Sequence, residues 1–530
     1  MEKVVIPKEE LENYNFKTFS LHEKRRDFAI QVQKTILDYK HFENMLIILS
    51  RQCLDERNFE ILNLLHNQVT MKAVSQKAKG KEKTKDNIKK VNDYFKHHDL
   101  FNQMIDFSKT HLNGHNVSMI VERLKKDWAN SRQKRKEYKE DPSAFTGKPQ
   151  YPKPKKLQNI VNYSIPLEGS KWSTKKLNKN RLGFTLSKRQ MLTFVNANHE
   201  YLKNKKVKSM TISLSHGHIY YNFNYVEKIN KNVKHNPLKS VRKEAGLDIG
   251  VNNLASIFIN DFISPSLIIS GTIFKHYNST FNRKLAKLNK EISKEVVEFK
   301  EIKNKKDELI KVPLKYSDRG INLRFIKSNL FEKRKRYFDD QFNKLSKKIL
   351  QYLKSHNVSH LAISKNLSFT KQTGEIQQRK KTKQNFYQIP FGKLLNFIEE
   401  KSVNFNIDVK SIDEAYSSKT SSLSSNVVDI QELSKTRKVT PTDLNGNRGV
   451  NNKRGLFKDS LLNILLNSDL NGAANHIKIR FPDVDLSLFR NHLHKVCNPI
   501  KITSTSELDK LLNNLKNSEV EKNITLQNVA

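Results

Sequence analysis

The chain has little of what several protein classes depend on. Its 530 residues include only two cysteines, Cys53 and Cys497, too few for a disulfide framework or a four-cysteine zinc site. No apolar run approaches the roughly 18 residues that a membrane-spanning helix needs, and the N-terminus lacks the hydrophobic stretch of a signal peptide. We therefore expect a cytosolic protein with no membrane partner.

Acidic residues are also scarce beside basic ones. The chain holds 97 Lys+Arg against 54 Asp+Glu, a formal charge of +43. An excess of this size, spread along the chain, repels itself unless a polyanion lies in a groove, so nucleic acid is the expected partner. The length and a hydrophobic content of 36% are enough for two or three domains.

The first part of the chain predicts helices and a basic connection. Residues 1 to about 125 have helical spacing, interrupted by the charged, glycine-containing run 77–85, which predicts a solvated loop. In residues 147–156 prolines alternate with lysines around Tyr151. This pattern predicts either an extended basic strip suited to phosphates and base stacking, or a domain linker.

A β-hairpin is expected next. Residues 207–214 and 219–226 have strand-like spacing, and the short glycine-containing segment 215–218 separates them. Four aromatic residues lie on the second strand: Tyr220, Tyr221, Phe223 and Tyr225. They are either a stacking platform for bases or the core of a small barrel, and we favour the core for at least half of them.

From Asp248 to Asp469, strand-like and helix-like pieces alternate, which predicts an α/β layer. Two long amphipathic stretches, at about 278–308 and 324–353, flank an expected loop at Tyr316 to Gly320. The second stretch carries the basic run 333–336. Such a run is either a solvated helix face or the lining of a duplex channel.

Two isolated acids stand in contexts that suit a metal site. Asp248 lies in the short apolar run 246–255, which ends in glycine and a polar turn. A strand there would hold the carboxylate at its rim, as a Mg²⁺ ligand requires, although a turn-starting or edge aspartate looks the same. Asp469 precedes the small residues Gly472, Ala473 and Ala474.

Asp469 has two interpretations. It is the N-cap of a helix, or it faces Asp248 across a metal site while the small residues let the helix pack close to a sheet. His492, His494 and Cys497 form a third polar cluster. Three ligands without a fourth favour a solvated helix turn over a metal centre.

Eight segments together carry a family resemblance. In chain order they are 246–255, 277–284, 333–349, 363–366, 384–391, 413–421, 454–457 and 467–475. Their order resembles TnpB, the family of transposon-encoded RNA-guided nucleases, and the related compact type V CRISPR effectors. The resemblance is closest between about 240 and 480.

The resemblance implies an α/β multidomain protein with a RuvC-like, RNase H-type nuclease domain in two parts, 239–415 and 459–498. It also implies a helical recognition lobe over 1–140 that includes the N-terminal part of a wedge domain, and a small β-barrel wedge over 141–238. The insert 416–458 separates the two nuclease parts, and 499–530 is expected to be a polar tail.

In the family three acids bind two divalent ions, Mg²⁺ or Mn²⁺, and Asp248 and Asp469 match the first and third. The chain departs from the pattern at the second, where Ser364, Lys365 and Asn366 follow the strand 360–363. Lysine cannot ligate Mg²⁺. We take Glu414 as the replacement because Ile407, Val409 and Ile412 precede it in a plausible strand.

Asp413 and Glu375 are the alternatives to Glu414, which would otherwise be an exposed acid at a strand end. A second departure is the run 417–425, which has serines where relatives often carry the cysteines of a zinc ribbon. No structural zinc is therefore expected. This segment must be held by packing, or stay mobile until nucleic acid binds.

The resemblance implies a guide RNA and target DNA as partners, with a monomer favoured, in a prokaryotic cytoplasm. The expected nucleic-acid contacts are basic or aromatic: Lys134, Arg135, Lys148, Tyr151, Lys153, Lys333, Arg334, Lys335, Arg336, Arg379, Lys380 and Lys381. The predicted function is an RNA-guided DNA endonuclease that uses two metal ions. The alternatives are a guided DNA-binding protein with weak or no cleavage, acting as a roadblock or repressor, and an unguided nuclease of the same fold.

Overall fold

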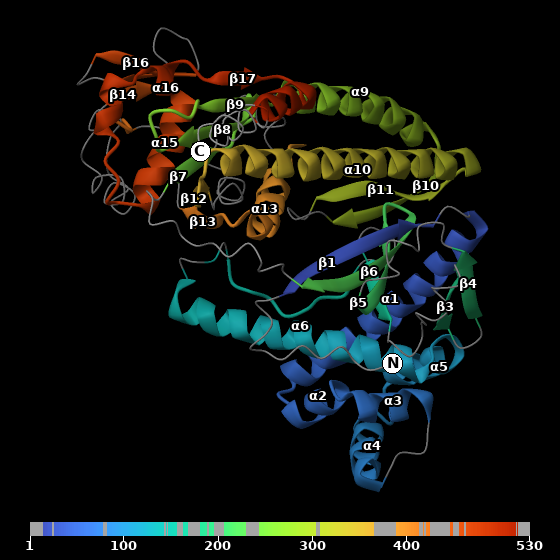
Figure 1. Ribbon diagram of the computed structural model, residues 1–530. Helices are drawn as coiled ribbons and strands as arrows, with labels where there is room; N and C mark the ends of the chain where they lie inside the picture. The colour runs from blue at the N-terminus through green and yellow to red at the C-terminus, as the bar shows by residue number, and fades with distance from the viewer. Residues whose placement is uncertain are drawn as a thin grey trace. The chain divides into compact units, whose positions relative to one another are not determined.

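The chain forms two compact units in a computed structural model (Figure 1). The first comprises Met1–Asn232 and Arg324–Glu332, and the second Val233–Leu323 and Lys333–Ala530. The structure describes residues 14–23, 26–77, 82–142, 145, 147–155, 163–167, 181–187, 190–195, 206–228, 243–303, 308–364, 388–412, 417, 420–423, 446–448, 455–459, 463–515 and 517. Within these ranges no helix combines the length and apolarity needed to cross a membrane.

The first unit is largely helical between Arg26 and Glu140, a longer helical region than the one predicted from spacing, which ended at about residue 125. Its helices are α1 (Arg26–Asp55), α2 (Phe59–Leu65), α3 (Gln68–Gln76), α4 (Glu82–Tyr94), α5 (Asp99–His111) and α6 (Gly114–Glu140). Two further details differ from expectation. A strand, β1 (Tyr14–His22), precedes the helices and pairs with a strand more than 190 residues away. The expected loop 77–85 is helical from Glu82 onward, because a polar run with good helix formers can extend a helix.

A four-stranded antiparallel sheet completes the first unit, in the order β1-β6-β5-β2. Its other strands are β2 (Tyr163–Leu167), β5 (Lys206–Ser215) and β6 (His218–Lys228), and a separate hairpin is formed by β3 (Arg181–Ser187) and β4 (Gln190–Val195). The predicted hairpin is confirmed as β5–β6. His216 and Gly217 both have positive φ, at 49° and 82°, as a two-residue turn joining twisted strands requires.

The aromatic residues of β6 build the core. Tyr221, Phe223 and Tyr225 are at most 2% exposed and join the helices of this unit in one hydrophobic cluster. Tyr220 is half-buried, and its hydroxyl donates to the carboxylate of Glu332. Because strand side chains alternate between the two faces of a sheet, Tyr220 lies on the face opposite the three core rings. The core interpretation is therefore confirmed for three of the four rings, which are not available to stack on bases.

The second unit contains a mixed six-stranded sheet in the order β13-β12-β7-β8-β9-β17, confirming the predicted α/β layer. Its strands are β7 (Glu244–Asp248), β8 (Asn253–Ile259), β9 (Leu267–Ser270), β12 (His360–Ser364), β13 (Asp408–Ile412) and β17 (Ile500–Ile502). β8 is antiparallel to β7 and β9. β12 is parallel to both β7 and β13.

Helices and smaller sheets surround this layer. The helices are α9 (Thr272–Lys294), α10 (Asp318–Ser355), α13 (Phe391–Ser402), α15 (Ser468–Arg480) and α16 (His494–Cys497), with the 3₁₀ turns η4 (Val403–Phe405) and η7 (Ser487–Asn491). One small sheet is the pair β10 (Val296–Lys303) and β11 (Leu309–Tyr316). The other consists of β14 (Gly446–Arg448), β15 (Leu456–Asp459) and β16 (Ile464–Asn467). The rings of Tyr277 on α9 and Tyr337 on α10 stack at 3.8 Å, so the two helices lie side by side (Figure 1).

Three expectations about the second unit are corrected. The first amphipathic stretch is helical only to Lys294, because the β-branched and aromatic residues after it favour a strand. α10 begins at Asp318, inside the expected loop, with Ser317 as its N-cap. The expected polar tail begins with β17, which pairs with β9, and continues as a helix over 505–515 whose Leu508 and Leu512 are buried.

Candidate active site

Helix α15 lies directly against the central strand β7. A methyl group built on Gly246 would lie 1.8 Å from the carbonyl oxygen of Ala473, and one built on Gly472 would lie 2.9 Å from Oδ2 of Asp248. A helix and a strand can approach so closely only where glycine, which has no side chain, stands at the contact. The predicted role of Gly472, Ala473 and Ala474 in close packing against a sheet is confirmed.

This packing sets Asp248 against α15 close to the start of that helix, where Asp469 lies. Asp248 is the last residue of β7, and Gly472, against which its carboxylate lies, is three residues after Asp469 on α15. Residues three apart share one face of a helix. The Asp248 carboxylate therefore meets α15 about one helical turn after Asp469, at the end of the central strand.

Asp469 does not cap its helix. The N-cap is Asn467, whose Oδ1 accepts hydrogen bonds from the backbone N–H groups of Asp469 and Leu470, both at 3.1 Å. The N-cap interpretation of Asp469 is thus wrong, since the neighbouring asparagine satisfies the first free amides. The carboxylate of Asp469 instead accepts a hydrogen bond of 2.6 Å from Nδ2 of Asn253, the first residue of β8.

A row of side chains crosses the sheet at the level of Asp248. Ser256 on β8 is the register partner of Asp248, and Ser364 ends β12 one residue after Ile363, the partner of Leu247. Partners in register point to the same face of a sheet. Both serines are 1% exposed, and neither hydroxyl has a hydrogen-bond partner within the described structure. Two unpartnered buried hydroxyls flank Asp248.

His476 lies one turn beyond Gly472 on α15. Its side chain is completely buried, and Nδ1 lies 3.0 Å from the carbonyl oxygen of Leu247. Burial lowers the pKa of His476 to about 4, against the opposing effect of this hydrogen bond. The imidazole is therefore neutral at physiological pH, and it donates its Nδ1 proton to strand β7.

A neighbouring side of α15 holds residues of the segment after β13. Nδ2 of Asn471 donates to the carbonyl of Thr420 at 2.8 Å, and Nδ2 of Asn475 donates to the carbonyls of Ser417 and Thr420, both at 2.7 Å. The guanidinium of Arg490 donates twice to the carbonyl of Leu423. Ser417, Thr420 and Leu423 of the zinc-lacking insert are thus held by side-chain hydrogen bonds to α15 and its surroundings.

Several predicted site residues lie outside the described residues. These are Glu414, its alternatives Asp413 and Glu375, and the basic residues Lys365, Arg379, Lys380 and Lys381. On either side of Glu414, Ile412 ends β13 and Ser417 is bound by Asn475. Over the described ranges, no group of three or more His, Cys, Asp or Glu side chains is placed to hold a metal ion. In the His492 cluster, the Cys497 thiol donates to the carbonyl of Leu465.

The predicted basic strip is bound to the protein's own helices. The ring of Tyr151 stacks on Trp128 at 4.8 Å, and the guanidinium of Arg135 lies 4.8 Å from the centre of the same ring. Asn44 exchanges two hydrogen bonds with the backbone of Lys155. Tyr151 therefore has a protein partner, whereas Lys134, Lys148 and Lys153 are exposed.

The basic run on α10 contains residues of two kinds. Arg334 is half-buried: Nε donates to Oδ1 of Asn278 at 3.0 Å, and the guanidinium lies 5.1 Å from the rings of Phe281 and Phe338. Lys333 and Arg336 are exposed, and Lys335 is half-buried. Arg334 joins α10 to α9, and the lysines and Arg336 remain candidates for phosphate contacts.

The sequence reasoning missed several residues that build this site. Asn253 lies five positions after Asp248, in the polar turn that follows the apolar strand. Asn471 and Asn475 are four residues apart, a spacing that places two amides on one helix face. That spacing, on a helix that also carries Gly472, Ala473 and Ala474, is a signal that could have identified the bound segment.

The chain was compared with known proteins. No protein-family model matches it, and no curated protein matches it significantly. Among solved structures, it is similar to a Cas12f1–sgRNA–target DNA complex, with 14% identity and a TM-score of 0.28, covering 88% of this chain and 100% of the other. A CRISPR–Cas12f ternary complex gives 15% identity and a TM-score of 0.32, covering 84% of this chain and 82% of the other. TM-scores this low do not establish a shared fold.

Proposed function

We propose that this chain is a divalent-metal-dependent DNA endonuclease with a RuvC-like, RNase H-type catalytic domain, directed to its target by a guide RNA. The observation that carries the proposal is the contact of α15 with β7, in which Gly472 lies against the carboxylate of Asp248 one turn from Asp469. The sheet supports it as well: β7, β8 and β9 are antiparallel, and β12 and β13 are added in parallel beside β7. This order fits the RNase H-type fold that the resemblance implies, and β17 extends the sheet beyond β9.

The residues at this site fit a hard cation. Carboxylate oxygens are preferred ligands of Mg²⁺ and Mn²⁺, and Asp248 and Asp469 supply two such groups at a strand end. We propose Glu414 as the third ligand. It follows Ile412, the last residue of β13, by two positions in the sequence, and Ile412 is the register partner of Ser364.

The remaining residues orient these acids. Asn253 fixes one oxygen of Asp469 by a hydrogen bond, and Asn467 caps the helix so that the Asp469 carboxylate need not. Bound divalent ions would lower the pKa of an attacking water and stabilise the leaving oxygen of a phosphodiester. Held by rigid elements, the carboxylates require little rearrangement to bind such ions.

RNA guidance rests on the charge and on the resemblance. A formal charge of +43 favours binding to an extended polyanion, and the order of the eight segments resembles an RNA-guided family. The wedge, the recognition lobe and the exposed basic residues Lys134, Lys148, Lys153, Lys333 and Arg336 are part of this proposal. Purification from a host carrying the native locus should yield one discrete structured RNA. Length-heterogeneous RNA removed by moderate salt would contradict guidance.

Cleavage of target DNA by the purified complex tests the active site. Asp248→Asn and Asp469→Asn should each reduce the Mg²⁺-dependent rate by about 10³-fold or more, while guided DNA binding stays near wild type because the phosphate contacts are untouched. Asp340→Asn, at an exposed position on α10, is the control and should cut normally. Near-normal cleavage by either site variant would refute the assignment.

The third ligand has its own test. Glu414→Gln should abolish cleavage as fully as Asp248→Asn, because the amide is nearly isosteric but lacks the charge that holds a cation. Lys365→Glu should not be required for activity. A wild type that binds guided DNA but cuts only after Lys365→Glu would show instead a guided binding protein whose second acid has been lost.

A further inference from the structure

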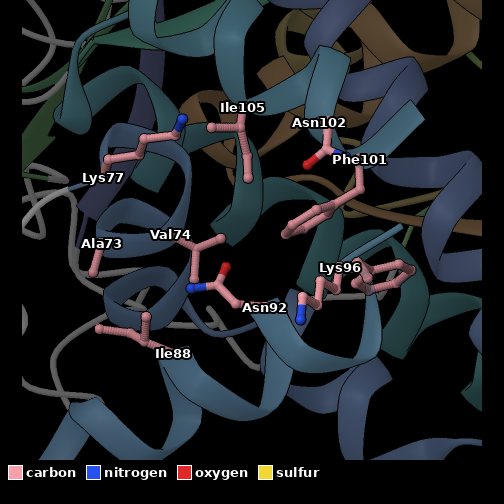
Figure 2. A pocket seen from close by; sticks show the side chains of 10 residues that line it. Ala73, Val74, Lys77, Ile88, Asn92, Lys96, Phe101, Asn102 and Ile105 are labelled. Carbon is pink, nitrogen blue, oxygen red and sulfur yellow. The ribbon is translucent and has the colours of Figure 1, made fainter. Parts of the chain in front are cut away.

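The helical part of the first unit contains a cavity of about 450 Å³ between α3, α4 and α5 (Figure 2). In its apolar wall, Val74 and Phe101 are at most 3% exposed. Its lysines and asparagines are exposed, and Lys77 is paired with Asp106 at 3.7 Å. The cavity therefore offers a ligand almost no apolar surface. The imidazole of His476 in the second unit, by contrast, makes a directed contact at the candidate active site.

One face of α15 carries three residues at the candidate site. Asp469, Gly472 and His476 follow at i, i+3 and i+7, a spacing that places them on one face of a helix. Gly472 lies against the carboxylate of Asp248, and Nδ1 of His476 lies 3.0 Å from the carbonyl oxygen of Leu247. A carbonyl oxygen only accepts, so the imidazole donates. The histidine therefore binds the peptide group that joins Leu247 to Asp248.

This hydrogen bond acts at a contact where packing gives little direction. Around it, α15 meets β7 through Gly246 on the strand and through Gly472 and Ala473 on the helix. Residues with little or no side chain allow a close approach, but they form no ridges that prevent one element from sliding along the other. A slide by one residue moves a helix by about 1.5 Å. Because a hydrogen bond tolerates only a narrow range of lengths and angles, the bond from His476 fixes the position of α15 along β7.

The chemistry of the side chain matters as well as its place. His476 is 0% exposed, and a hydrogen bond in a buried, low-dielectric environment is stronger than one in water. Histidine and asparagine both carry a nitrogen donor on the atom next to Cγ. Leucine carries a methyl group there and offers no donor. The three side chains therefore separate the hydrogen bond from the space that the imidazole fills.

We propose that His476 is a positioning residue of the candidate metal site. Through the carbonyl of Leu247 it holds the carboxylate of Asp248 in place relative to Asp469, which lies on the same helix as the histidine. Loss of a group that orients a metal ligand typically costs about 10–100-fold in metal affinity. The inference rests on the proposed function, because it concerns the same two carboxylates.

The test measures Mn²⁺ affinity by electron paramagnetic resonance on the full-length protein bound to its nucleic acids. His476→Leu removes the donor, so its Mn²⁺ affinity should fall about 10-fold. The Mg²⁺ concentration for half-maximal cleavage should rise by the same factor. His476→Asn restores a donor at the position of Nδ1 and should bind Mn²⁺ within about twofold of the wild type. If His476→Leu does not fold, His476→Gln, which moves the donor one bond further from Cα, replaces it with the same expected outcomes.

Two comparisons separate positioning from a loss of stability. Ile398→Val removes a methyl group from a residue of α13 that is 0% exposed, so it should lower the thermal midpoint and leave Mn²⁺ affinity unchanged. His476→Asn leaves a small cavity and should also lower the thermal midpoint. Retained Mn²⁺ affinity in this less stable variant would show that the donor, and not the stability, decides.

The possible failures are distinguishable. Equal Mn²⁺ affinity in His476→Leu and the wild type, with Asp248→Asn impaired, overturns the inference and leaves the proposed function intact. An equal loss in His476→Leu and His476→Asn also overturns it, because affinity then does not follow the donor. Normal Mn²⁺ binding by Asp248→Asn refutes the metal site and the inference together.

Discussion

Helix α15 meets β7 through glycine and alanine, whereas the hairpin β5–β6 meets the helices of its own unit through aromatic rings. At the first contact, carboxylates remain half-buried at a strand end, and the hydroxyls of Ser256 and Ser364 beside them have no hydrogen-bond partner among the described residues. At the second, Phe223 and Tyr221 are buried, and the Tyr221 hydroxyl donates to Glu23 at 3.0 Å. Small residues at a contact leave polar groups available for binding, and large rings at a contact are used for stability.

The aromatic side of this comparison predicts the largest effect. Phe223→Ala should lower the free energy of unfolding of the first unit by about 4 kcal/mol, because it removes a fully buried ring and leaves a cavity. The matched control is Asn224→Ala on the adjacent position of β6, where only side-chain hydrogen bonds to Thr18 and Ser209 are lost, at about 1 kcal/mol. Denaturant unfolding measures both, and equal effects would show that the rings are not core.

The contact of α15 with β7 predicts that the free energy of unfolding depends on pH. His476 has a pKa of about 4 in the folded chain against 6.5 ordinarily, so the unfolded state binds the proton first. The contribution of the neutral His476 side chain to the free energy of unfolding is fully present above pH 6.5. It is lost as the pH falls toward 4, and the total loss is about 3 kcal/mol. His476→Gln should remove this part of the slope. An unchanged slope between wild type and variant would contradict the burial of this imidazole.

The close approach of α15 predicts a smaller effect. Gly246→Ala should destabilise the second unit by about 2 kcal/mol, because the added methyl meets the Ala473 carbonyl and forces a backbone shift. Gly392→Ala in α13 is the control, since a methyl there meets nothing within 4 Å, and it should be neutral or stabilise by up to about 1 kcal/mol. A tolerated Gly246→Ala would mean that α15 does not lie directly on β7.

The features that the sequence could predict were those with local causes. The hairpin follows from alternation and from a turn with glycine at its second position. Asp248 on a strand and the tight packing after Asp469 follow from short apolar and small-residue runs. In each case the neighbouring residues alone determine the geometry.

Two kinds of feature could not be predicted from the sequence. Some depend on tertiary contacts, and others depend on which of two neighbouring residues with similar local preferences takes a position. Asn467 and Asp469 are both residues that favour the N-cap position. Asn467 takes it in the structure, and the carboxylate of Asp469 accepts a hydrogen bond from Asn253 instead. Arg334 looks like its basic neighbours until Asn278 and Phe281 are placed beside it. Strand β17 is too short to identify from Ile500 and Ile502 without its partner β9.

Metal binding at Asp248 and Asp469 is the most direct test of the account. The affinity for Mn²⁺, measured by electron paramagnetic resonance on the full-length protein bound to its nucleic acids, should fall at least about 10-fold in Asp248→Asn and in Asp469→Asn. Asp340→Asn should bind as the wild type does. If Mn²⁺ binds equally in all four proteins, the two carboxylates do not form a metal site, and the proposed nuclease chemistry is wrong.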